Sequence, residues 1–144
     1  MPAKDNEKLI FNDIVNKYNP NIEKAKSNHI VDNLAVSVDF IWKERDLTLL
    51  LEIDSYSASK FIFGEYVLLN QVDSYKSKCI LVIIHFYKKY NTLRTEKYIN
   101  FAIDKLKCKL PYVAFSNSEW NDLVQNNSKT KLIDIIKKRS KPTN

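Results

Sequence analysis

Two periodicities alternate along the chain and predict its helices and strands. Apolar residues recur at helical spacing in some segments, and they run together in others, as in a buried strand. Asn19-Pro20 ends the first helical pattern, because the residue before a proline disfavours the α region. In chain order, the pattern predicts a helix at 5–18, strands at 29–33, 36–42 and 47–54, a long helix from a cap at Ser57 or Ser59 to about Lys76, a strand at 79–86, a helix at 92–107, a strand at 112–115, and helices that begin at Ser118 and Thr130.

This order of elements predicts the fold class. The polar segment 43–46 is short enough to be the turn of a hairpin between the strands at 36–42 and 47–54. The segment 79–86 is almost entirely apolar, which is typical of a central strand buried on both faces. The chain is therefore predicted to be an α/β protein with a single mixed β-sheet flanked by helices.

Length and composition are those of an ordinary globular domain. The chain has 144 residues, of which 44% are hydrophobic and 28% charged, so we expect one domain over residues 1–136 and a basic flexible tail over 137–144. Cys79 and Cys108 fit no metal-binding pattern and are expected to be reduced thiols. No apolar segment has the length of a signal peptide core or a membrane span, so a cytoplasmic protein without a membrane partner is expected.

The net charge narrows the class of partner. A formal charge of +6 favours a polyanion, but it does not by itself separate nucleic acid from an anionic membrane surface or a basic solvated exterior. A single glycine excludes a glycine-rich phosphate loop. Neither histidine has a nucleophile at a recognisable spacing, which leaves serine or cysteine hydrolase chemistry unsupported.

Three carboxylates are predicted to converge where the hairpin strands meet. Glu52 and Asp54 end an apolar strand and point to the same face of it, and antiparallel pairing can bring Asp39 beside Glu52. Carboxylates this close repel unless a cation lies between them, and their hard oxygens favour Mg²⁺ or Mn²⁺ over zinc. The alternative is a set of solvated acidic residues at strand ends.

The order of these residues resembles a known pattern. A helix, a strand, a hairpin that carries Asp39 and then Glu52, and a following helix and strand resemble the αβββαβ core of the PD-(D/E)XK, or restriction-endonuclease-like, nuclease superfamily over residues 5–115. Gln71 and Tyr75 match the QxxxY element that many members carry. The resemblance implies metal binding by Asp39 and Glu52 and supporting roles for Gln71 and Tyr75. It also implies that Glu7 is the additional acidic residue of the first helix.

Asp54 departs from this pattern, because the family usually has a lysine there. A carboxylate cannot stabilise developing negative charge as an ammonium does. Three hypotheses stay open: Lys60 supplies the missing cation, Asp54 holds a second metal ion, or the site is inactive.

Basic residues mixed with aromatic ones offer candidate phosphate contacts. Each cluster has the alternative role of a solvated charged surface. The candidates are Lys76, Lys78, Lys88, Lys89 and Arg94.

These inferences lead to one main hypothesis about function. The sequence predicts a Mg²⁺- or Mn²⁺-dependent DNA endonuclease or resolvase-like enzyme that hydrolyses phosphodiester bonds as a homodimer. The alternative is a catalytically inactive protein of the same fold that binds nucleic acid or a protein partner.

Overall fold

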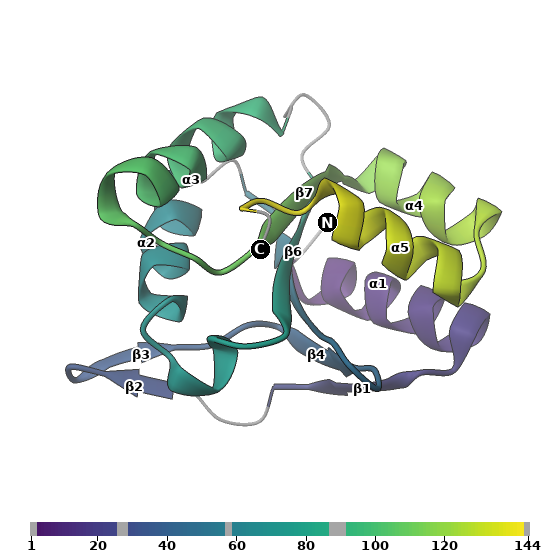
Figure 1. Ribbon diagram of the computed structural model, residues 1–144. Coiled ribbons are helices and arrows are strands. Elements are labelled where there is room, and N and C mark those ends of the chain that lie inside the picture. The colour runs from purple at the N-terminus through teal and green to yellow at the C-terminus, as the bar shows by residue number, and fades with distance from the viewer. Residues whose placement is uncertain (1–2, 26–28, 57–58, 87–91, 143–144) are drawn as a thin grey trace.

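The computed structural model describes residues 3–25, 29–56, 59–86 and 92–142 (Figure 1). The helices are α1 (Ala3–Tyr18), α2 (Ser59–Leu69), α3 (Leu93–Leu106), α4 (Asn117–Asn126) and α5 (Lys129–Arg139), with a short 3₁₀ helix, η1, at Asp73–Tyr75. The strands are β1 (Asn21–Lys24), β2 (His29–Val31), β3 (Leu34–Val36), β4 (Phe40–Lys43), β5 (Thr48–Asp54), β6 (Cys79–His85) and β7 (Tyr112–Ser116).

A mixed five-stranded sheet forms the centre of the molecule, in the order β1-β4-β5-β6-β7. β1 and β4 pair antiparallel, as do β4 and β5, whereas β5, β6 and β7 run parallel. The residues of β6 are all buried, as its apolar sequence predicts for a central strand. The predicted α/β fold with a mixed sheet flanked by helices is confirmed.

Two hydrophobic cores fill the two faces of the sheet. Leu49, Leu51 and Ile53 of β5 pack with α1, α4 and α5 on one face. Leu50 packs with α2 and α3 on the other face. Because side chains alternate along a strand, Glu52 and Asp54 point to the same face as Leu50, as the sequence predicted. Figure 1 shows the two groups of helices on opposite sides of the sheet.

The helix predicted to reach Lys76 ends earlier, at Leu69. Asn70 donates a hydrogen bond from Nδ2 to the carbonyl oxygen of Tyr66 at 2.7 Å, and the backbone N–H of Gln71 bonds the carbonyl of Leu68 at 2.9 Å. Such side-chain and short-range bonds compete with further helical turns. Gln71 therefore lies beyond the helix, and the predicted extension of this helix to about Lys76 is wrong.

The predicted strand 36–42 is also divided. β3 ends at Val36 and pairs only with β2, in a separate hairpin whose turn residues Asp32 and Asn33 have φ of 48° and 68°. β4 begins at Phe40, so Asp39 lies just before the strand. β1 was not predicted, because its sequence is mostly polar; it pairs with β4 at the edge of the sheet.

Residues 137–142, the described part of the segment expected to be a flexible tail, form regular structure. Lys137 to Arg139 belong to α5, and the backbone of Lys141 exchanges hydrogen bonds of 2.8 and 3.0 Å with Tyr112. The tail thus covers part of the β7 edge, where unpaired backbone groups would otherwise face solvent. Of the described helices, none is long and apolar enough to cross a membrane.

Truncation of a central β5 side chain should strongly destabilise the fold. Leu51 is fully buried, so Leu51→Ala is expected to lower the free energy of unfolding by about 2–5 kcal/mol, from lost burial and the cavity that remains. Leu93, which is 59% exposed, is the matched control, and Leu93→Ala should change it by less than about 0.5 kcal/mol. Urea denaturation measures both, and equal losses would contradict the packing described here.

Candidate functional site

Asp39 forms hydrogen bonds with the two residues of β5 that flank Glu52. Its backbone N–H donates to the carbonyl of Leu51 at 3.0 Å. Its Oδ2 accepts the backbone N–H of Ile53 at 2.7 Å. These two bonds bracket position 52, so the Asp39 and Glu52 side chains lie next to each other, as the sequence predicted.

The first helix brings a further carboxylate to this place. Asn6, which is buried, donates from Nδ2 to Ser55 Oγ at 2.9 Å and so ties the start of α1 to the end of β5. The next residue, Glu7, forms a side-chain hydrogen bond with Asp39. Glu7 therefore belongs to the cluster, and the role in metal binding that the resemblance implied for it stays a prediction.

Glu65 of α2 completes the cluster, and the sequence reasoning missed it. Ile62 and Tyr66 bury their side chains against the sheet, and this orientation brings Glu65 into hydrogen-bonding contact with Glu52. One signal was available in the sequence: Glu65 is the only acidic residue of α2, which is otherwise almost entirely apolar. A lone carboxylate in such a helix is costly unless it has a role or a partner. We call Glu7, Asp39, Glu52 and Glu65 the carboxylate cluster.

Burial and nearby negative charges raise the pKa values of Asp39, Glu52 and Glu65. Burial is the largest cause for Asp39, whose pKa rises to about 8, and the contact with Glu7 adds to it. Burial, followed by the charges of Asp39 and Glu65, raises the pKa of Glu52 well above its usual range. Burial also raises the pKa of Glu65 to about 7. Several of these groups therefore hold protons at neutral pH unless a cation compensates their charge.

The cluster has the donor atoms that a hard cation needs. The Oε2 atoms of Glu52 and Glu65 are buried and have no hydrogen-bond partner. Among the residues that the structure describes, no three His, Cys, Asp or Glu side chains already stand around a common point as metal ligands would. Instead the carboxyl groups pair with each other, Glu7 with Asp39 and Glu52 with Glu65. A set of carboxylate oxygens with unsatisfied members fits Mg²⁺ or Mn²⁺.

Asp54 makes different contacts from the other carboxylates. Its Oδ2 lies 2.7 Å from His85 Nδ1, and its Oδ1 accepts the backbone N–H of Tyr56 at 3.1 Å. His85 Nε2 lies 3.1 Å from the hydroxyl of Thr95 on α3. Asp54 and His85 are register partners on β5 and β6, and both are buried. Both oxygens of Asp54 thus already have protein partners.

Lys60 shares a groove with one member of the cluster. This groove, of about 500 Å³, lies between β3 and α2, and Lys60, Gly64 and Glu65 line it together with Val36 and Ser37. A Cβ atom at Gly64 would meet nothing within 4 Å, so the glycine faces open space rather than a packed neighbour. Lys60 is exposed and lines the same groove as Glu65.

The structure separates Gln71 and Tyr75 from the cluster. Tyr75 lies next to Cys79, and Cys79 pairs with Thr48 at the start of β5. Glu52, the β5 member of the cluster, lies four residues further along the strand, which is about 13 Å at about 3.3 Å per residue. Gln71, Tyr75, Lys76 and Lys78 therefore lie toward the start of β5 and β6, and the supporting roles that the resemblance implies for Gln71 and Tyr75 stay predictions.

The remaining basic candidates lie toward the cluster end of the sheet or outside the described residues. Arg94 is exposed on the first turn of α3, next to Thr95, which contacts His85. Lys88 and Lys89 lie outside the described residues. Arg94 thus remains a candidate phosphate contact.

Comparison with known proteins identifies the fold. No protein-family model matches the chain, and the search of curated proteins finds no match. The structure is similar to the crystal structure of the small subunit of the heterodimeric restriction endonuclease R.BspD6I, with a TM-score of 0.62 and 11% sequence identity. The similarity covers 90% of this chain and 75% of that chain. The chain therefore has a restriction-endonuclease-like fold, as its sequence predicted.

The raised pKa values predict how stability depends on pH without metal. The folded chain keeps protons on Asp39 and Glu65 up to pH 8 and 7 respectively, whereas the unfolded chain loses them near their ordinary values of 3.8 and 4.5. Over this interval the folded state binds more protons, so the free energy of unfolding should fall as pH rises from about 4 to about 8. Urea denaturation in EDTA measures this slope.

Neutral variants test the origin of that slope. In the double variant Asp39→Asn, Glu65→Gln, the free energy of unfolding should fall less than in the wild type as pH rises from about 4 to about 8. Asp134→Asn, which removes an exposed carboxylate of α5 outside the cluster, is the control and should keep the wild-type slope. A double variant with the wild-type slope would show that the cluster does not hold these protons.

The Asp54–His85 contact should be important for stability. Asp54→Ala leaves a buried imidazole nitrogen without its partner and is expected to lower the free energy of unfolding by about 1–3 kcal/mol. Asp54→Asn keeps an acceptor oxygen and should cost less. The control, Asp73→Ala, removes a carboxylate that is 93% exposed and should cost less than about 1 kcal/mol in the same urea titration. Equal losses in Asp54→Ala and Asp73→Ala would refute the structural role.

Proposed function

We propose that this protein is a metal-dependent nuclease that hydrolyses phosphodiester bonds in DNA. The observation that carries the proposal is the carboxylate cluster, in which acidic side chains from α1, α2, β5 and the residue before β4 meet on a restriction-endonuclease-like fold. The net charge of +6 supports a polyanionic substrate.

The cluster would hold Mg²⁺ or Mn²⁺ through Asp39, Glu52 and Glu65, with Glu7 as a neighbouring acid. A bound ion of this kind supplies polarisation of the scissile phosphate and lowers the pKa of an attacking water molecule. The raised pKa values support this assignment, since carboxyl groups that repel each other are relieved by a cation.

The positive charge that the family places after Glu52 would come from Lys60. Asp54 occupies that position but is bonded to His85 and Tyr56, which argues against its acting as a ligand for a second metal ion. Lys60 lines the same groove as Glu65 and is exposed. Its ammonium would stabilise negative charge at the phosphate.

A second subunit would allow both strands of a duplex to be cut. The structural neighbour is one subunit of a heterodimeric restriction endonuclease. We therefore propose that this chain acts as part of a dimer, either with a second copy of itself or with a different subunit. Size-exclusion chromatography with light scattering, with and without DNA, measures the oligomeric state.

The second candidate function is DNA or protein binding without cleavage. The observation that favours it is Asp54, which stands where the family has a lysine and is engaged with a buried histidine. In that case the carboxylate cluster would be a remnant of a catalytic site, and affinity for DNA would be independent of Glu52.

Cleavage assays separate the two candidates. Purified protein is expected to cut duplex, nicked or branched DNA in Mg²⁺ or Mn²⁺, and to lose this activity in EDTA. Asp39→Asn, Glu52→Gln and Glu65→Gln should each lower the rate by about 100-fold or more, because each removes a metal ligand. Asp134→Asn, which changes an exposed carboxylate of α5 outside the cluster, should retain the wild-type rate.

The source of the positive charge is tested with a matched pair of lysines. Lys60→Ala should lower the cleavage rate by about 100-fold, whereas Lys131→Ala, on α5 across the sheet, should not. A rate lost with Asp54→Asn but kept with Lys60→Ala would instead support a second metal ion at Asp54. The non-catalytic candidate predicts that the protein binds DNA in a salt-sensitive way but neither cleaves it nor binds metal in calorimetry. It also predicts that Glu52→Gln leaves the affinity for DNA unchanged.

A further inference from the structure

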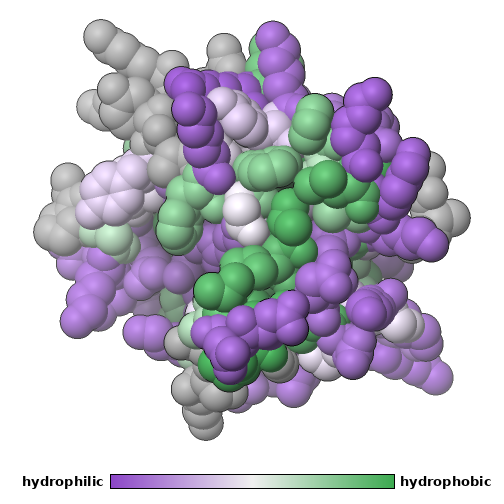
Figure 2. Space-filling model, turned by 90° about the vertical axis from the view of Figure 1, so that its left-hand side faces the viewer, coloured by the Kyte–Doolittle hydropathy of each residue, from purple (hydrophilic) through white to green (hydrophobic). Residues whose placement is uncertain are grey.

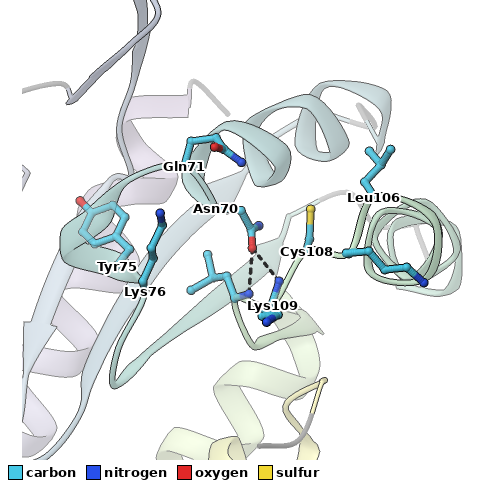
Figure 3. Close-up of a pocket in the computed structure, with 9 residues that line it drawn as sticks. Asn70, Gln71, Tyr75, Lys76, Leu106, Cys108 and Lys109 are labelled. Carbon is cyan, nitrogen blue, oxygen red and sulfur yellow. Dashed lines mark hydrogen bonds between the residues drawn. The ribbon is translucent and has the colours of Figure 1, made fainter.

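A second pocket, of about 220 Å³, lies toward the start of β5 and β6, away from the carboxylate cluster near the end of β5. It is formed by the end of α2, the turn into η1, and the segment between α3 and β7 (Figure 3). We call it the lysine pocket, because Lys76, Lys107 and Lys109 line it. Asn70, Gln71 and Cys108 also line it. Gln71 and Lys76, which the sequence assigned to catalysis and DNA binding, thus belong to a different place in the molecule.

The lysine pocket is positively charged. Every charged residue that lines it is a lysine. Lys76 Nζ contacts Asp73 Oδ1 at 2.9 Å, and Lys107 Nζ donates to the carbonyl of Asp104 at 2.9 Å. An ammonium group has three N–H donors, so each of these lysines keeps donors for a ligand. Burial raises the pKa of the Cys108 thiol, so the thiol stays neutral and adds no negative charge.

Hydrogen bonds fix the floor of the pocket. Asn70 Oδ1 accepts the backbone N–H groups of Lys109 and Leu110 at 2.9 and 2.8 Å. The hydroxyl of Tyr66 donates to the carbonyl of Leu110 at 2.6 Å. Figure 3 shows Asn70 at the centre, with Gln71 and Lys76 on one side and Cys108 on the other. Because this frame is formed without a ligand, binding loses little entropy in ordering the protein.

One of the lysines occupies a backbone position that disfavours it. Lys107 follows the last turn of α3 with φ of 58°, in the left-handed region. Glycine or asparagine is preferred there, because the backbone of other residues is strained in this conformation. A lysine complements the negative end of the helix, and it also places its charge at the rim of the pocket.

The size and charge of the pocket define its ligand. Pockets that enclose whole small molecules measure about 300–1,000 Å³, so this smaller one suits a single charged group. We propose that the lysine pocket binds a phosphoryl group, either of a nucleotide or at the end of a nucleic-acid strand, through Lys76, Lys107 and Lys109. This site is separate from the carboxylate cluster, because no member of the cluster lines the lysine pocket.

Binding measurements with defined phosphates test the proposal. The full-length protein, in metal-free buffer at low salt, is titrated by calorimetry with inorganic phosphate, with adenosine monophosphate, and with a short single-stranded oligonucleotide with or without a 5′-phosphate. Lys107→Asn combined with Lys109→Gln should weaken phosphate binding by about tenfold or more, because two charged hydrogen-bond donors are lost while asparagine tolerates the left-handed backbone. Adenosine monophosphate should lose affinity to the same extent.

Controls assign the effect to the pocket. Lys105→Gln removes an exposed charge from α3 outside the pocket and should leave phosphate binding unchanged, as should Glu52→Gln, which disables the proposed nuclease site. A preference for the 5′-phosphorylated oligonucleotide identifies a strand end as the source, and binding of the mononucleotide alone identifies a free nucleotide. If the double variant is unfolded by circular dichroism, Lys76→Gln and Lys109→Gln replace it as single variants.

Two results would overturn the proposal. One is the absence of binding by all of these phosphates to the wild-type protein at low salt. The other is equal weakening in Lys105→Gln and in the pocket variants, which would indicate attraction by the overall positive charge of the chain rather than by this pocket.

Discussion

The carboxylate cluster depends on the way Asp39 is held against β5. Its backbone N–H and its Oδ2 bond to the residues on either side of Glu52, at 3.0 and 2.7 Å. This contact forces two acidic side chains to lie next to each other at a partly buried strand end. Repulsion of this kind costs free energy that the apolar packing on both faces of β5 offsets. A strained group of charges held by a rigid scaffold is typical of a functional site.

The two hydrophobic cores decide which helices can contribute to the cluster. α1 packs on one face of the sheet and reaches the cluster through its first turn, where Asn6 bonds Ser55. α2 packs on the other face and contributes Glu65 from its middle. The cluster thus lies where helices from opposite faces meet at the end of one strand.

α2 runs back along the sheet from the end of β5, so its two ends lie near two different pockets. Lys60 near its start lines the groove beside the cluster, and Asn70 just past its end forms the floor of the lysine pocket. Figure 2 shows the face that α2 and α3 cover, where apolar side chains lie among polar ones. Phe61 and Phe101 are large apolar residues of these helices that remain exposed, at 69% and 54%.

The sequence by itself determined the fold class and the main metal-ligand candidates. The uninterrupted apolar run of β6 and the alternation along β5 depend only on local order, so they predicted the central strands and the shared face of Glu52 and Asp54. The helix ends were less predictable, because Asn70 stops α2 through a side-chain bond that competes with the helix. Because α2 ends at Leu69, Gln71 and Tyr75 lie outside the helix and toward the start of β5 and β6.

Only the tertiary structure decided which residues meet. Glu65 joins the cluster because its helix packs on the face toward which Glu52 points, and no spacing along the chain encodes that contact. Asp54 has a structural partner because parallel pairing sets it opposite His85. Local sequence fixes the period and direction of side chains, whereas long-range pairing and packing decide their neighbours. The charges that a carboxylate or a lysine faces are therefore a property of the fold.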